Sequence, residues 1–317
     1  PVRMYQYPNP QTLRHQTRLR DGAQLLPHTG VQVGRGRPMT ATWGLIIDVA
    51  RCHDCNNCFL ACKDEFVGND WLPYSKAHTD RGQRWMNILR RERGGYPLVE
   101  VAYLPKPCQH CERPPCVKAA RNSAVAVRED GIVLIDPNKA QGQKQLVEAC
   151  PYGAIFWNEA YQAPQKCSLC AHLLDEGWQA PRCVQACPTG AMGAFKMVGD
   201  EWQRRIEAEG LSAYLSEHEC VPRVLYKNLK RFTHGFIAGS VALGDTDECA
   251  QNARVVLTDE QGRALSETRT DNYGDFKLHD LEEVASTYFV EITVTGQPLK
   301  SVAVEFEASL NLGTIII

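Results

Sequence analysis

Apolar and polar residues alternate along the last third of the chain, as in β-strands with one buried face. Residues 254–258, 288–294 and 301–306 are each predicted to form a strand. Turn-forming residues separate these runs: Gly262, Asn272-Tyr273-Gly274 and Gly296. Several short strands at this spacing predict a small antiparallel β-sandwich or barrel, which we place at residues 233–317.

The pattern is weaker in the rest of the chain. Residues 1–40 are rich in Arg, Pro, Gly and Gln without sustained periodicity, which indicates an extended arm. The apolar run at 43–48 predicts one strand, and residues 41–232 otherwise show little helix or strand signal between groups of cysteines. We expect metal ligands to replace much of the apolar core there, and the fold class to be α+β.

Composition narrows the possible classes of protein. The 317 residues suffice for two or three domains. The net charge of -2 argues against a nucleic-acid partner. No uncharged apolar run has the length of a transmembrane helix, and the first residues lack the apolar core of a secretory signal. We therefore expect a cytoplasmic chain with no membrane anchor of its own, unless a partner carries an export signal for both.

Twelve of the fourteen cysteines lie in tight groups between Cys52 and Cys187. A disulfide framework spreads its cysteines to join distant loops, whereas thiols two residues apart cannot easily pair with one another. Their thiolates can converge on a metal centre instead. The grouping therefore indicates metal ligands in a reducing compartment. The two isolated cysteines, Cys220 and Cys249, are expected to be packed or free thiols.

The spacing within the groups is that of ferredoxin repeats. Cys52-x2-Cys55-x2-Cys58-x3-Cys62 has the bacterial spacing, in which three cysteines bind one [4Fe–4S] cluster and the fourth binds its neighbour. The other groups are Cys108-x2-Cys111-x4-Cys116 and Cys167-x2-Cys170-x12-Cys183-x3-Cys187-Pro188. A lone Cys150-Pro151 has the typical ending of a further repeat. The chain thus contains four repeats of four ligand positions each.

Four of these positions carry no cysteine, and the losses are not scattered. Counting by the same spacing back from Cys150 and on from Cys116 reaches the four positions Ala140, Gln143, Leu146 and Ala120. If paired repeats exchange their fourth ligands, all four losses belong to one cluster. Three [4Fe–4S] clusters with four thiolates each are therefore predicted. Their ligands are Cys52, Cys55, Cys58 and Cys187 for the first; Cys167, Cys170, Cys183 and Cys62 for the second; and Cys108, Cys111, Cys116 and Cys150 for the third.

Structural zinc is the competing interpretation, since paired Cys-x2-Cys groups also bind zinc. Zinc sites have no use for a triple x2 spacing or a trailing Cys-Pro, so the spacing favours iron–sulfur clusters. His53, His110 and His172 lie within the groups. Because the cysteine count is complete, we expect these rings to form hydrogen bonds near the clusters or to face solvent, rather than to bind iron.

Four repeats in this order resemble the electron-transfer subunits of the dimethyl-sulfoxide-reductase superfamily of molybdenum or tungsten enzymes. Within it, the chain most resembles the iron–sulfur subunits of pyrogallol–phloroglucinol transhydroxylase and related resorcinol-type hydroxylases. The lost cluster carries this resemblance, together with segments 47–58, 84–88, 90–94, 129–137, 170–175 and 270–276. The last segment is similar to the transthyretin-like β-domain that ends such subunits. The resemblance covers residues 42–317, and the arm at 1–40 has no counterpart.

The resemblance implies a heterodimer in which this chain is a non-catalytic, electron-transfer subunit. A large partner subunit would hold molybdenum bound by two pterin guanine dinucleotides. It would hydroxylate or transhydroxylate a polyhydroxybenzene of the resorcinol or pyrogallol type. In the wider family the cluster lost here is the one farthest from the catalytic subunit, next to a membrane anchor. Its loss suits a complex that does not pass electrons to a quinone.

The alternative is a ferredoxin-type carrier that docks on several oxidoreductases, or an electron-transfer subunit of another soluble molybdenum or tungsten oxidoreductase. A ferredoxin acting alone rarely needs an additional β-domain and arm, so the subunit interpretation is favoured. For the β-domain we expect a role in packing and in an interface, since no polar cluster converges in its predicted strands.

Overall fold

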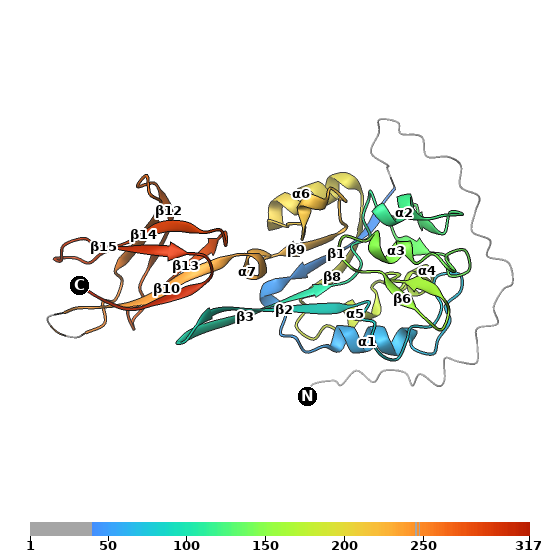
Figure 1. The fold of residues 1–317 in the computed structure, drawn as a ribbon, viewed down its shortest axis with the longest axis horizontal. Helices are drawn as coiled ribbons and strands as arrows, with labels where there is room; N and C mark the ends of the chain where they lie inside the picture. Colours follow the sequence, from blue (N-terminus) through green and yellow to red (C-terminus); the bar gives the residue numbers. More distant parts are fainter. Residues whose placement is uncertain (1–39, 245, 247) are drawn as a thin grey trace. The chain divides into compact units, whose positions relative to one another are not determined.

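The computed structural model describes residues 40–317 except 245 and 247, so the predicted arm lies outside the described residues apart from residue 40. The first sheet is built on β1 (Thr42–Asp48), which confirms the strand predicted at 43–48. β8 (Met192–Met197) pairs with β1 antiparallel and β9 (Val224–Lys227) pairs with it parallel, so β1 is the central strand (Figure 1). Residues 44–47 are all buried, as expected of a strand covered on both faces.

Of the helices in the described residues, α1 to α5 contain or closely flank grouped cysteines or Cys150, whereas α6 and α7 follow the last group. The helices are α1 (Asn57–Phe66), α2 (Pro115–Ala119), α3 (Gln145–Glu148), α4 (Ala171–Asp175), α5 (Arg182–Gln185), α6 (Gly199–Glu209) and α7 (Lys230–Thr233), with 3-10 turns at Val49–Arg51 and Ser216–His218. Two small hairpins lie between them: β4 (Val125–Val127) with β5 (Val133–Ile135), and β6 (Phe156–Asn158) with β7 (Ala163–Gln165). Of the helices in the described residues, none has the length and the apolar character needed to cross a lipid bilayer.

A long hairpin that the residue pattern did not predict joins β2 (Asn87–Gly95) to β3 (Leu98–Lys106). The arginines of β2 make its sequence polar, so the strand cannot be recognised from an alternation of apolar and polar residues. Arg93 is nevertheless buried, and its guanidinium donates to Glu100 Oε2 at 2.9 Å and to the carbonyl of His234 at 2.6 Å. These partners offset the cost of burying the charge. A pattern of apolar and polar residues does not reveal such partners.

An apolar core packs the cysteine-bearing region, contrary to the expectation that metal ligands replace much of it. Its largest fully buried members are Trp85, Tyr226, Phe66, Leu45 and Ile47. The same core includes Cys58, Cys62, Cys170 and Cys183. Thiols and apolar side chains therefore share one packed interior, and the loops that carry the cysteines rest on it.

The predicted C-terminal strands form two sheets. Their strands are β10 (Gly235–Ala242), β11 (Arg254–Thr258), β12 (Ala264–Arg269), β13 (Asp275–Leu281), β14 (Ser286–Thr293), β15 (Lys300–Phe306) and β16 (Leu310–Ile316). One sheet has the order β13-β10-β16 and the other β12-β11-β14-β15. Ile237 and Phe276 from the first sheet share one core with Val255, Val290 and Phe306 from the second. The strands predicted at 254–258, 288–294 and 301–306 are β11, β14 and β15, and these predictions are confirmed.

The C-terminal sheets are not wholly antiparallel, because β10 and β16 pair in parallel. A parallel pair needs a long connection between its strands, and here the intervening strands of both sheets supply it. The predicted turns are present, since Gly262, Gly274 and Gly296 have φ of 74°, 78° and 85°. A side chain is rarely tolerated at these values, so the glycines determine where the strands end.

Ion pairs connect the β2–β3 hairpin to the cysteine-bearing region and to the C-terminal strands. Arg90 forms an ion pair with Asp54 in the first group of cysteines. Arg91 pairs with Glu283, and Glu100 pairs with Lys277 in β13. The hairpin therefore contacts both the cysteine-bearing region and the C-terminal strands.

Candidate iron–sulfur centres

The loops that carry the cysteines contain residues in the left-handed backbone region. Asp54 and Asn56 have φ of 54° and 60° in the first loop, and His110 has φ of 43° in the second. Leu169 and Cys170 have φ of 55° and 49° in the last. Such a backbone conformation costs a non-glycine residue roughly 1–2 kcal/mol, so these loops carry local backbone strain.

The first predicted set gathers around the start of α1. The pKa of Cys58 is raised to about 12, first by burial and then by the charges of Cys52, Cys187 and Cys55. Burial would also raise the pKa of Cys187, but the Thr189 hydroxyl and backbone N–H groups lower it below its usual value. The structure thus brings Cys187 from the far end of the region to the three cysteines of the first loop.

The second predicted set lies deeper in the core. Burial raises the pKa of Cys62 well above its usual value, and the charges of Cys167 and Cys170 raise it further. The pKa of Cys183 is raised in the same way, by burial and then by Cys170, Cys167 and Cys62. The N–H of Leu169 donates to Cys167 Sγ at 3.3 Å. Cys62 therefore lies near Cys167 and Cys170 of the last group, and its binding to the same cluster stays a prediction.

The third predicted set surrounds a cavity. Cys108, Cys111, Cys116 and Cys150 all line one pocket. Burial raises the pKa of Cys116 to about 11, and the charges of Cys108 and Cys150 add to this rise. N–H groups donate to two of the thiols, from His110 to Cys108 Sγ at 3.5 Å and from Ala154 to Cys150 Sγ at 3.4 Å.

These surroundings fit an iron–sulfur cluster. The Tyr152 hydroxyl lines the third cavity, and it is buried without a hydrogen-bond partner in the described part of the chain. His110 Nε2 and Ser168 Oγ, in the cysteine loops, are likewise buried without a hydrogen-bond partner among the described residues. Buried polar atoms are rarely left unpaired, and the sulfurs of a cluster accept hydrogen bonds. Across residues 40–244, 246 and 248–317, no three His, Cys, Asp or Glu side chains are grouped as they would be around a single metal ion.

The sets are adjacent to one another in a definite order. The charge of Cys58, from the first set, contributes to the raised pKa of Cys183 in the second. Burial raises the pKa of Cys167, from the second set, to about 11, and the nearby charge of Cys108 from the third raises it further. The second set therefore lies between the first and the third. Cys55 of the first set is exposed to solvent.

The four positions without cysteine also converge. Ala120, Ala140 and Leu146 belong to one apolar cluster that also contains Cys116 of the third set. Gln143 is buried, and its amide holds Arg121, the residue after Ala120: Nε2 donates to the Arg121 carbonyl at 3.0 Å, and Oε1 accepts from the Arg121 N–H at 2.8 Å. The predicted convergence is confirmed, whereas the loss of a cluster at this place stays a prediction.

Leu146→Ala is expected to destabilise the protein by about 2–5 kcal/mol, because Leu146 is fully buried there and its removal leaves a cavity. Anaerobic thermal unfolding should show a clear fall in Tm. Leu60→Ala is the matched control, since Leu60 is 58% exposed and its truncation should change Tm little. Equal effects of the two substitutions would contradict the filled site.

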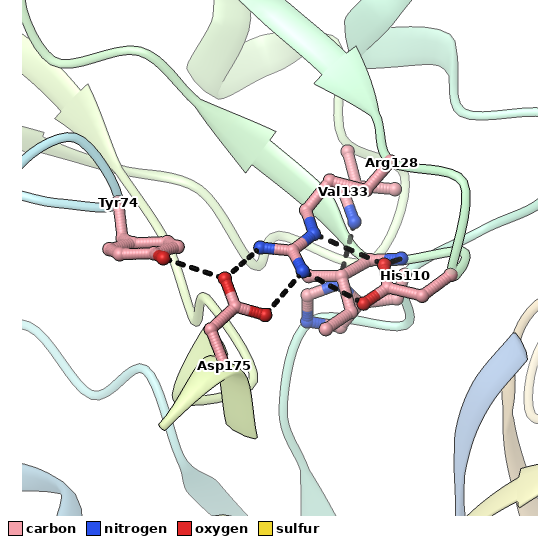
Figure 2. A network of polar contacts seen from close by, with 7 residues as sticks. Tyr74, His110, Arg128, Val133 and Asp175 are labelled. Atoms are coloured by element: carbon pink, nitrogen blue, oxygen red, sulfur yellow. Dashed lines mark hydrogen bonds and ion pairs between the residues drawn. The ribbon is translucent and has the colours of Figure 1, made fainter. Parts of the chain in front are cut away.

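The three histidines behave as expected from a complete set of thiols. His53 is exposed. His172 lies 2.9 Å from Glu65 and stacks on Trp71, with 4.3 Å between the ring centroids. His110 Nδ1 accepts from the Val133 N–H at 3.1 Å (Figure 2), so the other ring nitrogen carries the proton in the neutral ring. Burial lowers the pKa of His110 well below its usual value, which keeps the ring neutral.

A polar network that the sequence did not single out connects the β4–β5 turn to α4. Arg128 donates to both oxygens of Asp175 at 2.8 and 2.6 Å and to Asp130 Oδ2 at 3.0 Å, and Tyr74 donates to Asp175 at 2.6 Å (Figure 2). A bidentate pair of this kind holds its two segments in one orientation. α4 follows Cys170, so the network positions the loop of the second set. The available signal was that Asp130 and Asp175 both lie in segments that carry the resemblance.

The two isolated cysteines differ in their surroundings. Cys249 is exposed. Cys220 is buried beside Cys108 and Cys111 in one apolar cluster, and its Sγ donates to the His218 carbonyl at 3.1 Å. Cys220 is thus a packed thiol next to the third set, a position that sequence spacing could not have revealed.

Comparison with known proteins identifies the family. A family model described as a 4Fe–4S dicluster domain matches residues 99–197. The chain is 45% identical to the pyrogallol hydroxytransferase small subunit of Pelobacter acidigallici, over 86% of this chain and 97% of that one. The chain therefore belongs to this family of iron–sulfur subunits. It is also 34% identical to one subunit of the anaerobic dimethyl sulfoxide reductase of Escherichia coli, over 49% of this chain and 73% of that one.

Membership in the family of iron–sulfur subunits confirms the predicted resemblance and decides between the two metals. The cofactors are [4Fe–4S] clusters, not zinc. The dicluster model spans the second and last groups of cysteines, whereas the first group lies before it. The assignment of each cysteine to a cluster stays a prediction.

Several solved structures resemble the chain over about a quarter of its length. They include 5-hydroxyisourate hydrolase of Klebsiella pneumoniae, at 14% identity and a TM-score of 0.23, which covers 26% of this chain and 90% of that one. Transthyretin from Sparus aurata has 13% identity and a TM-score of 0.20, over 25% of this chain and 86% of that one. Likenesses at this level carry no argument about the C-terminal sheets.

Proposed function

We propose that this chain carries three [4Fe–4S] clusters and exchanges electrons with a large molybdopterin-binding catalytic subunit. That partner would hydroxylate or transhydroxylate a polyhydroxybenzene. The observation that carries the proposal is the identity of 45% with the pyrogallol hydroxytransferase small subunit. The match covers 97% of that subunit. The three adjacent sets of four cysteines support the number of clusters.

The arrangement of the sets suits electron transfer. When bound, each [4Fe–4S] cluster supplies a one-electron carrier whose potential depends on its surroundings. The buried second set, between the other two, would connect them. The exposure of Cys55 supports a first cluster near the surface, where electrons could pass to or from a partner. The N–H groups and hydroxyls around the thiols would hold the clusters in place and favour their negative charge.

The C-terminal strands support a separate role. We propose that residues 233–317 form a transthyretin-like domain for packing and interfaces, and that residues 41–232 form the ferredoxin-like domain. The support is that the two C-terminal sheets share a core of their own, distinct from the core beneath the cysteines. A cytoplasmic location is part of the same proposal, because all fourteen cysteines are free thiols.

The test of the partner is anaerobic purification of the native complex followed by size exclusion. A large subunit that contains molybdenum should elute together with this chain. The complex should transfer hydroxyl groups between polyhydroxybenzenes. A chain that elutes alone with its full iron content would favour the ferredoxin-type carrier instead.

The test of the cluster number is metal analysis of the same material. About twelve iron atoms per chain are expected, four for each predicted cluster, with matching sulfide and little zinc. About sixteen irons would mean that a fourth cluster is present and that the ligand count is wrong. About eight would mean that one of the three sets of thiols does not bind a cluster.

A further inference from the structure

A buried cation lies among the cysteines, and it has no acidic partner among the residues that the structure describes. Lys166 follows β7 and is only 4% exposed. Its ammonium donates to the carbonyls of Val133 and of Cys167, the latter at 2.9 Å. In the part of the chain that the structure describes, no carboxylate lies within ion-pair distance of it. A buried charge with no counter-charge is costly, so a negative group is expected beside it.

The surroundings of Lys166 point to where that negative charge comes from. Lys166 lines the cavity surrounded by all four cysteines of the third set. It also lines a second pocket, of about 280 Å³, together with Cys167 and Ser168 at the second set. Its charge opposes the rise that burial causes in the pKa of Cys116, Cys150 and Cys167. The ammonium therefore lies between the second and third sets.

Val133 of β5 connects Lys166 to the loop of the third set. The Val133 carbonyl accepts from Lys166, while the Val133 N–H donates to His110 Nδ1 at 3.1 Å. His110 lies between Cys108 and Cys111 in the sequence. Val133 thus ties the cation and the loop of the third set to the same strand.

We propose that Lys166 is the buried counter-charge of the third and second clusters and raises their reduction potentials, that of the third most. Reduction adds one negative charge to a cluster, and a nearby cation in a low-dielectric interior stabilises the reduced form. The third cluster is affected most because Lys166 lines the cavity of its whole set, whereas it approaches the second set at Cys167. The inference rests on the proposed three-cluster function.

The test is a redox titration followed by electron paramagnetic resonance on the anaerobically purified complex with its partner subunit. The variants are Lys166→Met, which removes the charge, Lys166→Gln, which keeps a hydrogen-bond donor, and Lys166→Arg, which keeps the charge. Lys118→Met is the matched control, because Lys118 is an exposed lysine in α2, two residues from Cys116. The signal of the third cluster is assigned by its loss in Cys116→Ser.

Both uncharged variants should make the third cluster at least tenfold harder to reduce, a fall of about 59 mV in its midpoint potential. The second cluster should shift less, and the first should not shift. Lys166→Arg should stay nearer the parent than either uncharged variant, and Lys118→Met should change little because water screens its charge. Loss of the third cluster from both uncharged variants, with retention in Lys166→Arg, would also support a required charge.

Unchanged potentials in Lys166→Met and Lys166→Gln would overturn this inference and leave the three-cluster function standing. Loss of the cluster from Lys166→Arg as well as from the uncharged variants would assign Lys166 a packing role and overturn it too. A parent complex with no signal from a third cluster would overturn the proposed function, and this inference with it.

Discussion

Cys187→Ala is expected to destroy the cluster bound by Cys52, Cys55 and Cys58, while the cluster of the last cysteine group stays largely intact. Cys62→Ala should have the reverse effect. The reason is the exchange of fourth ligands: Cys187 approaches the first loop, whereas Cys62 approaches Cys167 and Cys170. A cluster that loses one of four thiolates loses both an iron ligand and a connection between distant segments.

Spectroscopy that resolves the clusters, together with iron analysis, measures the result for each variant. Each substitution should remove up to about four irons, from a different cluster in each case. Cys220→Ser and Cys249→Ser are the controls, and both should keep the parent iron content. If Cys187→Ala instead removes the cluster that Cys183 binds, the exchange is wrong and the fourth ligands must be reassigned, even if the total of three clusters stands.

Anaerobic removal of iron with a chelator is expected to unfold the cysteine-bearing region and leave the C-terminal sheets folded. Cys58, Cys62, Cys170 and Cys183 are members of the core beneath β1, so loss of the clusters leaves buried thiols and cavities in that core. Metal binding contributes directly to folding where the ligands come from separate segments. The strands from β10 to β16 have a core without predicted ligands and should not depend on iron.

Hydrogen exchange measured by mass spectrometry can follow the unfolding of each region after the iron is removed. Peptides from 45–62 and 167–187 should lose their protection after chelation, and peptides from β11 and β14 should keep it. Protein carried through the same steps without chelator is the control. Loss of protection in both parts together would mean that the chain unfolds as one unit, and would contradict the proposed boundary near residue 233.

Local spacing carried most of the information about the centres. Thiolate ligands must lie a few residues apart to reach one cluster from a single loop, so the groups from Cys52 to Cys187 were visible without a structure. The lost cluster could be recognised because its four positions follow from the same spacing, and Ala120, Ala140 and Leu146 do share one apolar cluster. Alternation in β15 was readable because buried and exposed residues alternate along its second half, whereas β11 was readable as an apolar run, since Val255–Thr258 are all buried.

Long-range contacts decided the rest. The β2–β3 hairpin was missed because Arg93 is buried against Glu100, a pairing that exists only after the strands meet. The parallel pairing of β10 with β16 joins strands at opposite ends of the C-terminal region, so no local pattern could indicate it. Lys166 next to Cys167 looks like an ordinary surface lysine in the sequence, and Cys220 looks isolated. Folding alone brings both to the third set, because the environment of a side chain depends on segments far from it in the sequence.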